Sequence, residues 1–365
     1  MSFKIKILDF AKGQEYPIFK INRNKNWIDY GDDNNYPDYL LKVYHNGSNK
    51  HKAIINRKVD MTTGGGINAT TTELIKFIEN RWGGADIEEI SKKINYDYEI
   101  FGGFSLMVRW SLDGTKVAAV DYIPYHKCRL SGDEKRILIS KDWSEVRKIE
   151  NKPVEYPIFD PLKAMEERTQ IFYYIDETTG IDYYPLPYYS STLNWIELDW
   201  EISNFHLSSV RNGFMPGFIL NFATGIPSLD EMNDAYKEFE KKYTGTSNAG
   251  KFILTFSEGQ DQKPELTPIE LSNSDERFIL LHKEMKEEIL IGHSVTSPLL
   301  FGIRTEGQLG GRTELLEALA IFQSTYINNK QKTLEKQLDK ISKYAGVNEP
   351  IKFNKYIIDF DNIEK

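Results

Sequence analysis

The sequence predicts an α+β fold, because strand-like and helix-like patterns occupy separate stretches of the chain. Residues 104–124, FSLMVRWSLDGTKVAAVDYIP, alternate with the period of two that strands require, and Asp113-Gly114 is a typical hairpin turn. Residues 274–293 instead carry apolar side chains three and four positions apart, which indicates an amphipathic helix. An α+β N-terminal domain followed by long helices accounts for both patterns.

Composition limits the classes of function. The chain has 365 residues, enough for two or three domains with cores of their own. Its net charge of -8 disfavours a protein that wraps nucleic acid tightly. The single Cys128 excludes an internal disulfide and a multi-cysteine zinc site. The sequence has no run of 18 apolar residues, and its N-terminus is too charged for a signal peptide, so we expect a cytoplasmic protein without membrane contact.

The N-terminal domain is expected to end near residue 190. Asp29, Asp32 and Asp33 lack the ligand spacing and closing Glu of a calcium loop, so we interpret them as a turn before a helix that begins at Tyr36-Pro37. Between 131 and 168 the pattern is too weak to place elements. The other elements expected here are helices over 50–61, 70–82 and 86–101, and a second hairpin over 170–187.

Two long helices flank a small module in the C-terminal half. The first, 190–213, is apolar around most of its circumference and therefore needs neighbours on several sides. The second is 274–293. After a glycine-rich connection, Thr313 can cap a helix of about 28 residues, and the tail is strand-like and irregular. The module itself should contain a strand at 214–222, a helix at 228–243, and strands at 251–258 and 265–271.

The connection FGIRTEGQLGG, 301–311, raises the question of phosphate binding. Gly302 and Gly307 have the spacing of a P-loop, but Gln308 and Leu309 stand where the Lys and the hydroxyl residue would be. A P-loop also follows a buried strand, whereas this stretch follows a helix. These departures disfavour a nucleotide site. We expect a functional loop, because about 15 residues is long for a helix–helix connection.

The remaining polar residues carry no enzyme signature. The sequence contains no HExxH or GxSxG motif, and we expect each histidine, His51 and His293 included, to be a surface or interface side chain. Glu287 and Glu288 are adjacent on a helix and face different directions, so they are not an acid–base pair. We expect no catalysis, no cofactor and no metal site.

The order of these elements resembles the portal proteins of tailed bacteriophages, over about 37–340. The resemblance is carried by Asn212-Gly213 with Pro216-Gly217, by HSVTSPLLFG from His293 to Gly302, and by Leu309-Gly310-Gly311 before a helix. It implies a portal fold with an α+β wing, a two-helix stem, a small α/β clip, a tunnel loop and a long C-terminal helix with a short crown. The implied boundaries are 1–190 for the wing, 191–212 and 274–293 for the stem helices, 213–273 for the clip, 294–312 for the tunnel-loop region, 313–344 for the long helix and 345–365 for the tail.

The resemblance also implies roles for individual residues. An acidic stem wall would repel phosphates, so that DNA slides through without being trapped. The residues expected in the tunnel loop are Arg304, Glu306, Gly307, Gln308, Leu309, Gly310, Gly311 and Arg312. Those expected to face the channel from the stem are Lys283, Glu284, Glu287 and Glu288. Those expected to pack the stem are Trp195, Trp200, Phe205, Phe278 and Met285.

The function implied is a non-enzymatic ring at one vertex of the capsid, a dodecamer in that family. Double-stranded DNA would be packaged and ejected through it with weak, non-specific contact, after assembly in the host cytoplasm. Terminase large subunit and a head–tail connector would dock on it in turn, and the major capsid protein would surround it in the virion. Two alternatives stay open: a monomeric adaptor or binding module of a virion, and a nucleotide-dependent enzyme, against which the missing lysine at 308 counts.

Overall fold

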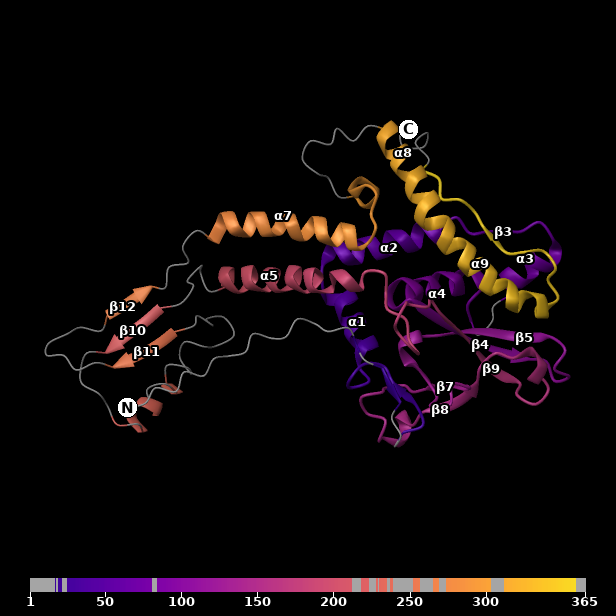
Figure 1. The fold of residues 1–365 in the computed structure, drawn as a ribbon, viewed down its shortest axis with the longest axis horizontal. Helices are drawn as coiled ribbons and strands as arrows, with labels where there is room; N and C mark the ends of the chain where they lie inside the picture. The colour runs from indigo at the N-terminus through magenta and orange to yellow at the C-terminus, as the bar shows by residue number, and fades with distance from the viewer. Residues whose placement is uncertain are drawn as a thin grey trace. The chain divides into compact units, whose positions relative to one another are not determined.

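The structure is a computed structural model, drawn in Figure 1, and the chain divides into two compact units. One unit comprises Met1–Asn194 with Ile289–Lys365, and the other comprises Trp195–Glu288. We describe each by itself. The structure describes residues 17, 19–21, 25–80, 84–211, 218–222, 228, 230–234, 237–238, 252–256, 265–268, 274–302 and 312–358.

Helix α4, Ile87–Phe101, is central to the first unit. Asp86 accepts a hydrogen bond from the backbone N–H of Glu89, whose carboxylate accepts one from the N–H of Asp86, a reciprocal cap that fixes where the helix begins. Gly102 ends the helix with a left-handed backbone, φ 83°. The helix predicted over 86–101 is therefore confirmed.

A three-stranded antiparallel sheet packs on α4, in the order β5-β4-β9. Central strand β4, Gly103–Trp110, is joined to β5, Val117–Ile123, by a turn in which Gly114 has φ 66°. The predicted hairpin at 104–124 is thus confirmed. Because β4 is covered by α4 on one face, its side chains Phe104, Leu106 and Val108 are fully buried.

The second predicted hairpin, 170–187, is wrong. Its first arm exists as β9, Thr169–Ile175, but β9 pairs with β4 and not with a following arm. Pro185 and Pro187 have no backbone N–H to give to a strand ladder. Instead, the buried Tyr184 hydroxyl donates to the Ile28 carbonyl at 2.7 Å, so this segment is held by side chains.

The weakly patterned stretch 131–168 contributes to a second antiparallel sheet, in the order β6-β7-β8. The helices predicted from Tyr36 and over 50–61 and 70–82 are confirmed, with shifted ends. The strands of this sheet are β6, Cys128–Leu130, β7, Arg136–Ile139, and β8, Val154–Pro157. The helices are α1, Tyr36–Asn46, α2, Asn49–Thr63, and α3, Thr72–Glu79. The remaining short strands are β1, Lys20–Ile21, β2, Ile28–Asp29, β3, Ile67–Asn68, and β13, Lys352–Phe353, which pair β1 with β2 and β3 with β13.

The predicted long C-terminal helix is confirmed, but it is interrupted. Helix α8, Arg312–Phe322, passes through a π-helical turn, Gln323–Ile327, into α9, Asn328–Ser342. The apolar stripe of α9 packs in the same core as α4 and its sheet. The buried members of that stripe are Leu334, Leu338 and Ile341.

The second unit holds most of α5, Leu193–Arg211, and of α7, Ser274–Gly292, together with a three-stranded sheet. Helical residues 230–234 and 237–238 fall between β10 and β11, which pair in parallel, as a crossover helix does. Both long helices and the three strands of the module are therefore confirmed. In this sheet β10, Phe218–Phe222, lies between β11, Phe252–Phe256, and the antiparallel β12, Glu265–Pro268.

Candidate functional site

Most of the predicted tunnel loop lies outside the described residues. Arg312 is described: it is the exposed first residue of α8. Its role in the loop stays a prediction. The predicted loop residues outside the described part of the chain are Arg304, Glu306, Gly307, Gln308, Leu309, Gly310 and Gly311.

The four stem residues predicted to face a channel lie on α7 and are all exposed. Lys283, Glu284, Glu287 and Glu288 fall within two helical turns. Lys286 lies in the same stretch, so three carboxylates and two ammonium groups leave residues 283–288 with a net charge of -1. This net charge has the sign that a phosphate-repelling wall requires, and the orientation of these residues toward a channel stays a prediction.

The predicted packing residues of the stem differ in burial. Met285 on α7 is fully buried within the single chain, whereas Trp195 and Trp200 on α5 are partly exposed. Phe205 is exposed, and the side chain of Phe278 lies outside the described part of the structure. Among the described side chains of these helices, Leu207 and Leu280 are also exposed. The single chain therefore leaves apolar surface on both helices.

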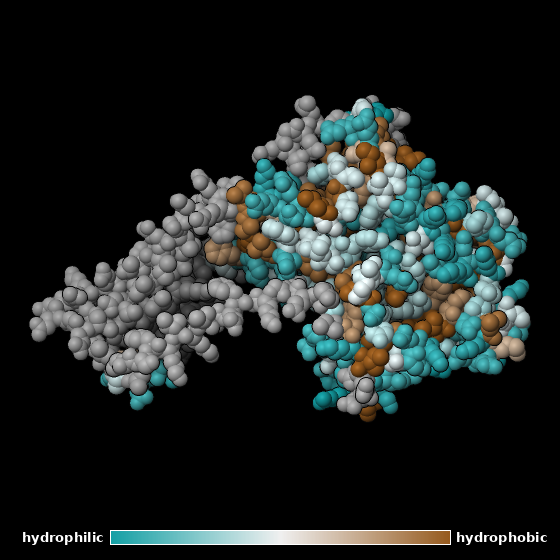
Figure 2. Space-filling model, in the orientation of Figure 1, coloured by the Kyte–Doolittle hydropathy of each residue, from teal (hydrophilic) through white to brown (hydrophobic). Residues whose placement is uncertain are grey.

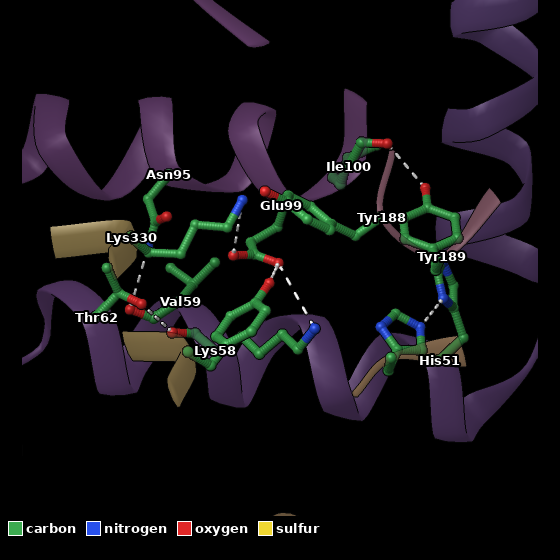
Figure 3. A network of polar contacts seen from close by, with 12 residues as sticks. His51, Lys58, Val59, Thr62, Asn95, Glu99, Ile100, Tyr188, Tyr189 and Lys330 are labelled. Atoms are coloured by element: carbon green, nitrogen blue, oxygen red, sulfur yellow. Dashed lines mark hydrogen bonds and ion pairs between the residues drawn. The ribbon is translucent and has the colours of Figure 1, made fainter. Parts of the chain in front are cut away.

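The first unit contains a buried charged cluster that sequence analysis did not predict (Figure 3). Lys58 on α2, Glu99 on α4 and Lys330 on α9 are all nearly inaccessible to solvent. The Glu99 carboxylate points between the two ammonium groups, with Oε2 4.0 Å from Lys58 Nζ and Oε1 3.9 Å from Lys330 Nζ. Burial lowers the pKa of Lys58 to about 8, and it also lowers the pKa of Lys330. One carboxylate thus joins three helices.

Tyrosines surround this charged cluster. The Tyr326 hydroxyl, in the π-helical turn, donates to Glu99 Oε2 at 2.6 Å, and the ring of Tyr326 lies 4.1 Å from Lys58 Nζ. Lys330 Nζ lies 3.4 Å from the Tyr98 ring centroid and 4.3 Å from that of Tyr188. Aromatic faces attract ammonium groups, and a desolvated contact of this kind contributes about 2 kcal/mol. These contacts fix the π-turn and α9 against α4.

A pair of histidines lies beside the cluster, where α7 ends. Nδ1 of His51 and Nε2 of His293 are 2.8 Å apart, so one ring donates to the other. Both rings are buried, and the Tyr189 ring stacks on His293 with centroids 5.1 Å apart. Burial lowers the pKa of His51 to about 3 and that of His293 well below 6.5, with nearby Lys58 adding to both shifts.

The expectation that His51 and His293 are surface or interface residues is therefore wrong. The sequence offered one signal: His51 lies on the same apolar face as Ile54 and Ile55, which are fully buried. Similarly, Lys330 occupies the core-facing position between Tyr326 and Leu334, four residues from each. A lysine at a core position predicts a buried counter-charge, but the sequence does not identify Glu99 as that partner.

The charged cluster and the histidine pair join separate segments of the backbone. Their ammonium, carboxylate and imidazole groups are buried. Among the described residues, no three His, Cys, Asp or Glu side chains lie together as metal ligands, and no helix is long and apolar enough to cross a membrane. The histidine pair holds His293, the residue after α7, and the charged cluster holds the start of α9; these two points precede and follow 303–311 in the chain. Both contacts lie within the first unit, on the two sides of the predicted tunnel loop in the chain.

Comparison with known sequences tests the resemblance to phage portal proteins. No protein-family model matches the chain. A probable portal protein of Escherichia phage P2 is 21% identical to it over 195 residues, which are 53% of this chain and 54% of that protein. The match therefore spans about half the length of this relative.

Comparisons of structure extend the similarity to most of the chain. A chain from the neck of a native gene transfer agent particle, computed with C12 symmetry, covers 90% of this chain with a TM-score of 0.59 at 13% identity, over 86% of its own length. A chain from the virion of a native gene transfer agent particle covers the same shares with a TM-score of 0.57 at 11% identity. The predicted α+β class is confirmed. The resemblance to phage portal proteins is therefore confirmed. The chain is similar in sequence to a probable phage portal protein and shares the fold of a gene transfer agent neck chain.

Proposed function

We propose that this chain is a portal protein that forms a ring-shaped channel for double-stranded DNA at one vertex of a capsid. The observation that carries the proposal is the fold shared over 90% of the chain with a neck chain from a twelve-fold symmetric assembly. The sequence similarity to a probable phage portal protein supports it independently. The location that follows is the virion, after assembly in the host cytoplasm.

Exposed apolar residues on the stem helices support the ring. Phe205 and Leu207 on α5 and Leu280 on α7 are about half exposed in the single chain, and covering the exposed half of such a side chain stabilises association by about 1 kcal/mol. In a ring, neighbouring subunits would cover them. The same exposure is compatible with a monomeric adaptor that binds another protein, so the number of subunits separates the two functions.

The charge of α7 supports a conduit in preference to a DNA-binding protein. Glu284, Glu287 and Glu288 are exposed, and twelve copies would line a channel with carboxylates. Phosphates would be repelled from that wall, which lets DNA slide. The packaging motor, terminase large subunit, would dock on the clip, 213–273, and so would the connector, a head–tail adaptor. The major capsid protein would contact the wing. Catalysis has no place in this function.

The number of subunits tests the proposal. We expect the purified protein to form rings of about 510 kDa, twelve copies of the 42.3 kDa chain, with a central hole in negative-stain images. Phe205→Asp should abolish rings while far-UV circular dichroism stays unchanged, and Leu112→Asp, an exposed residue of the β4–β5 turn, is the control. A homogeneous 42.3 kDa monomer at all concentrations would favour the adaptor.

Fluorescently labelled double-stranded DNA tests the channel wall. Wild-type rings should not bind it measurably at 150 mM salt, because the wall is acidic. A variant with Glu284, Glu287 and Glu288 all changed to Lys should retain DNA, with an affinity that falls steeply as salt increases. Tight binding by the wild type would contradict a sliding wall without contradicting the ring.

A further inference from the structure

A cavity of 340 Å³ lies beside the charged cluster, within the first unit. Side chains from α4, the segment after β9, the π-turn and α9 line it. Its volume lies at the lower end of the range of small-molecule pockets and is enough for one or two side chains of a partner. The lining residues that matter for recognition are Tyr98, Asp176, Tyr188, Tyr326, Asn329 and Lys330.

Lys330 lines this cavity, and its buried Nζ lacks a hydrogen-bond partner among the described residues. An ammonium group carries three N–H donors, but no acceptor among the described residues lies within hydrogen-bond distance of Lys330 Nζ. Glu99 Oε1 is 3.9 Å away, and that oxygen also has no hydrogen-bond donor among the described residues. Tyrosine faces compensate part of the charge but accept no strong hydrogen bond. A buried donor left unsatisfied is costly, so an occupant that accepts from Lys330 would be favoured.

The charges of the walls indicate what the occupant is. Asp176 lines the cavity and accepts hydrogen bonds from the hydroxyls of Tyr98 at 2.9 Å and Tyr188 at 3.1 Å. With Lys58, Lys330 and Glu99, the cluster and its cavity hold two ammonium groups and two carboxylates. An added full charge would be buried without a counter-charge, whereas a neutral amide can accept from the lysine and donate to the aspartate.

An exposed apolar strip borders the cavity. Tyr188 is 59% exposed, Ile291 is 68% exposed and Ile321 is 54% exposed. Hydrogen bonds tie the cavity rim to this strip: Ser294 N–H donates to the Ile291 carbonyl at 2.8 Å, and the Thr325 hydroxyl donates to that of Ile321 at 2.8 Å. Figure 2 shows hydrophobic residues interrupting the hydrophilic surface over α8. Apolar surface around a socket with an unsatisfied donor is typical of a protein-binding hot spot.

We propose that this socket, the cavity and its apolar strip, receives an adjacent copy of this chain, which inserts an Asn or Gln side chain whose carbonyl oxygen accepts a hydrogen bond from Lys330 Nζ. The inference rests on the proposed ring, in which every subunit offers one surface to a different surface of the next copy. The second copy is the occupant favoured by the similarity to a chain of a twelve-fold neck, because such a ring places a copy on each side of every subunit.

Photo-cross-linking of the purified full chain tests who occupies the socket. A benzophenone amino acid at Ile321, in the exposed strip beside the cavity, should give a covalent dimer of the chain on irradiation of assembled rings, with mass spectrometry placing the second attachment within reach of an Asn or Gln. The same label at Ile149, which is exposed elsewhere on the unit, is the control. Rings without the dimer would overturn the inference and leave the ring intact, whereas absence of rings in the wild type would overturn the proposed function.

Two matched variants test the role of the lysine. Lys330→Met removes the ammonium group that lines the cavity, and Lys58→Met removes its buried neighbour, which does not line it. Both variants leave Glu99 with one lysine, so both should lower subunit stability by similar amounts. Only Lys330→Met should weaken assembly, raising the midpoint concentration for ring formation about tenfold or more in mass photometry. Equal effects on assembly, or none, would overturn the inference.

Discussion

The two faces of α4 are held in different ways. On the face toward the β5-β4-β9 sheet, Ile87, Ile90 and Ile94 are fully buried among aliphatic and aromatic side chains. On the face toward α2 and α9, Asn95 donates to the Val59 carbonyl at 3.5 Å and Glu99 meets two lysines. The aliphatic face gains free energy from buried area and tolerates changes of shape. The polar face depends on particular partners, so it sets where α2 and α9 lie.

That difference bears on function because the polar face holds α9, which follows the predicted tunnel loop and α8 in the chain. Gln331 on α9 donates to the Thr62 carbonyl of α2 at 2.9 Å, which extends the same polar contact along the helix pair. A buried ionic network contributes less to stability than well-packed apolar residues would. We therefore infer that its value is positional: it gives α9 one register on α2 and α4.

The largest expected effect is that of Glu99→Gln. It leaves Lys58 and Lys330 buried without their shared carboxylate, so the free energy of unfolding at pH 7 should fall by about 3–5 kcal/mol in urea titrations. Ile94→Val on the opposite face should cost only about 0.5–1.5 kcal/mol. The comparison fails if the two variants are equally stable.

Raising the pH sharpens this test. Burial already depresses the pKa of Lys58 to about 8 in the folded protein, below its ordinary value of 10.5. Between those values the unfolded state binds more protons, so stability rises with pH. Glu99 itself raises the pKa of Lys58, so Glu99→Gln should lower that pKa further and recover part of its loss relative to the wild type as the pH rises toward 8, whereas the loss of Ile94→Val should stay constant.

Tyr326→Phe comes next. The variant removes the 2.6 Å hydrogen bond to Glu99 Oε2 but keeps the ring, which fills the same space over Lys58. Because hydrogen bonds to charged groups contribute about 1.5–3 kcal/mol, the free energy of unfolding should fall by about that amount. Hydrogen exchange should also accelerate at 323–327, where the π-turn loses its anchor. Unchanged exchange there would show that the turn is held by other contacts.

Acid should weaken the folded state through the histidine pair. His51 and His293 have lowered pKa values when folded, so between pH 6.5 and about 3 the unfolded state binds protons that folded His51 does not. Stability then falls by about 1.4 kcal/mol per pH unit for each histidine. Buried Asp97 has the opposite effect on stability. Burial raises its pKa to about 7, so the folded state binds its proton first and gains stability as the pH falls.

The test therefore compares how steeply the free energy of unfolding falls with pH in the wild type and in His51→Gln, measured by thermal unfolding from pH 7 to 4. The variant should lose stability less steeply as the pH falls. His45→Gln, which changes an exposed histidine, should follow the wild type. Parallel profiles for all three proteins would contradict a neutral buried pair.

How far the sequence predicts the structure depends on the range of the interactions. Helix α4 follows from local information, because the Asp86–Glu89 cap and the aliphatic spacing lie within the helix itself. Strand β9 itself is predicted, but its pairing is predicted wrongly because its partner β4 lies about 60 residues earlier, and pairing at that range leaves no local trace. In the same way His51 and His293 are 242 residues apart in sequence. Sequence predicts which elements form, but only the fold pairs these groups.

The smallest expected effect comes from the solvent-exposed edge of the same helix pair. Lys92 Nζ on α4 lies 3.3 Å from Asp60 Oδ1 on α2, and both side chains are about half exposed. Water screens such a pair, so Lys92→Met should change the free energy of unfolding by less than about 0.5 kcal/mol, and 0.5 M salt should remove the difference. This pair joins the same two helices as Lys58 and Glu99. A loss above 1 kcal/mol would mean that charge alone, without burial, holds α2 on α4, and the contrast between the buried cluster and the surface would no longer stand.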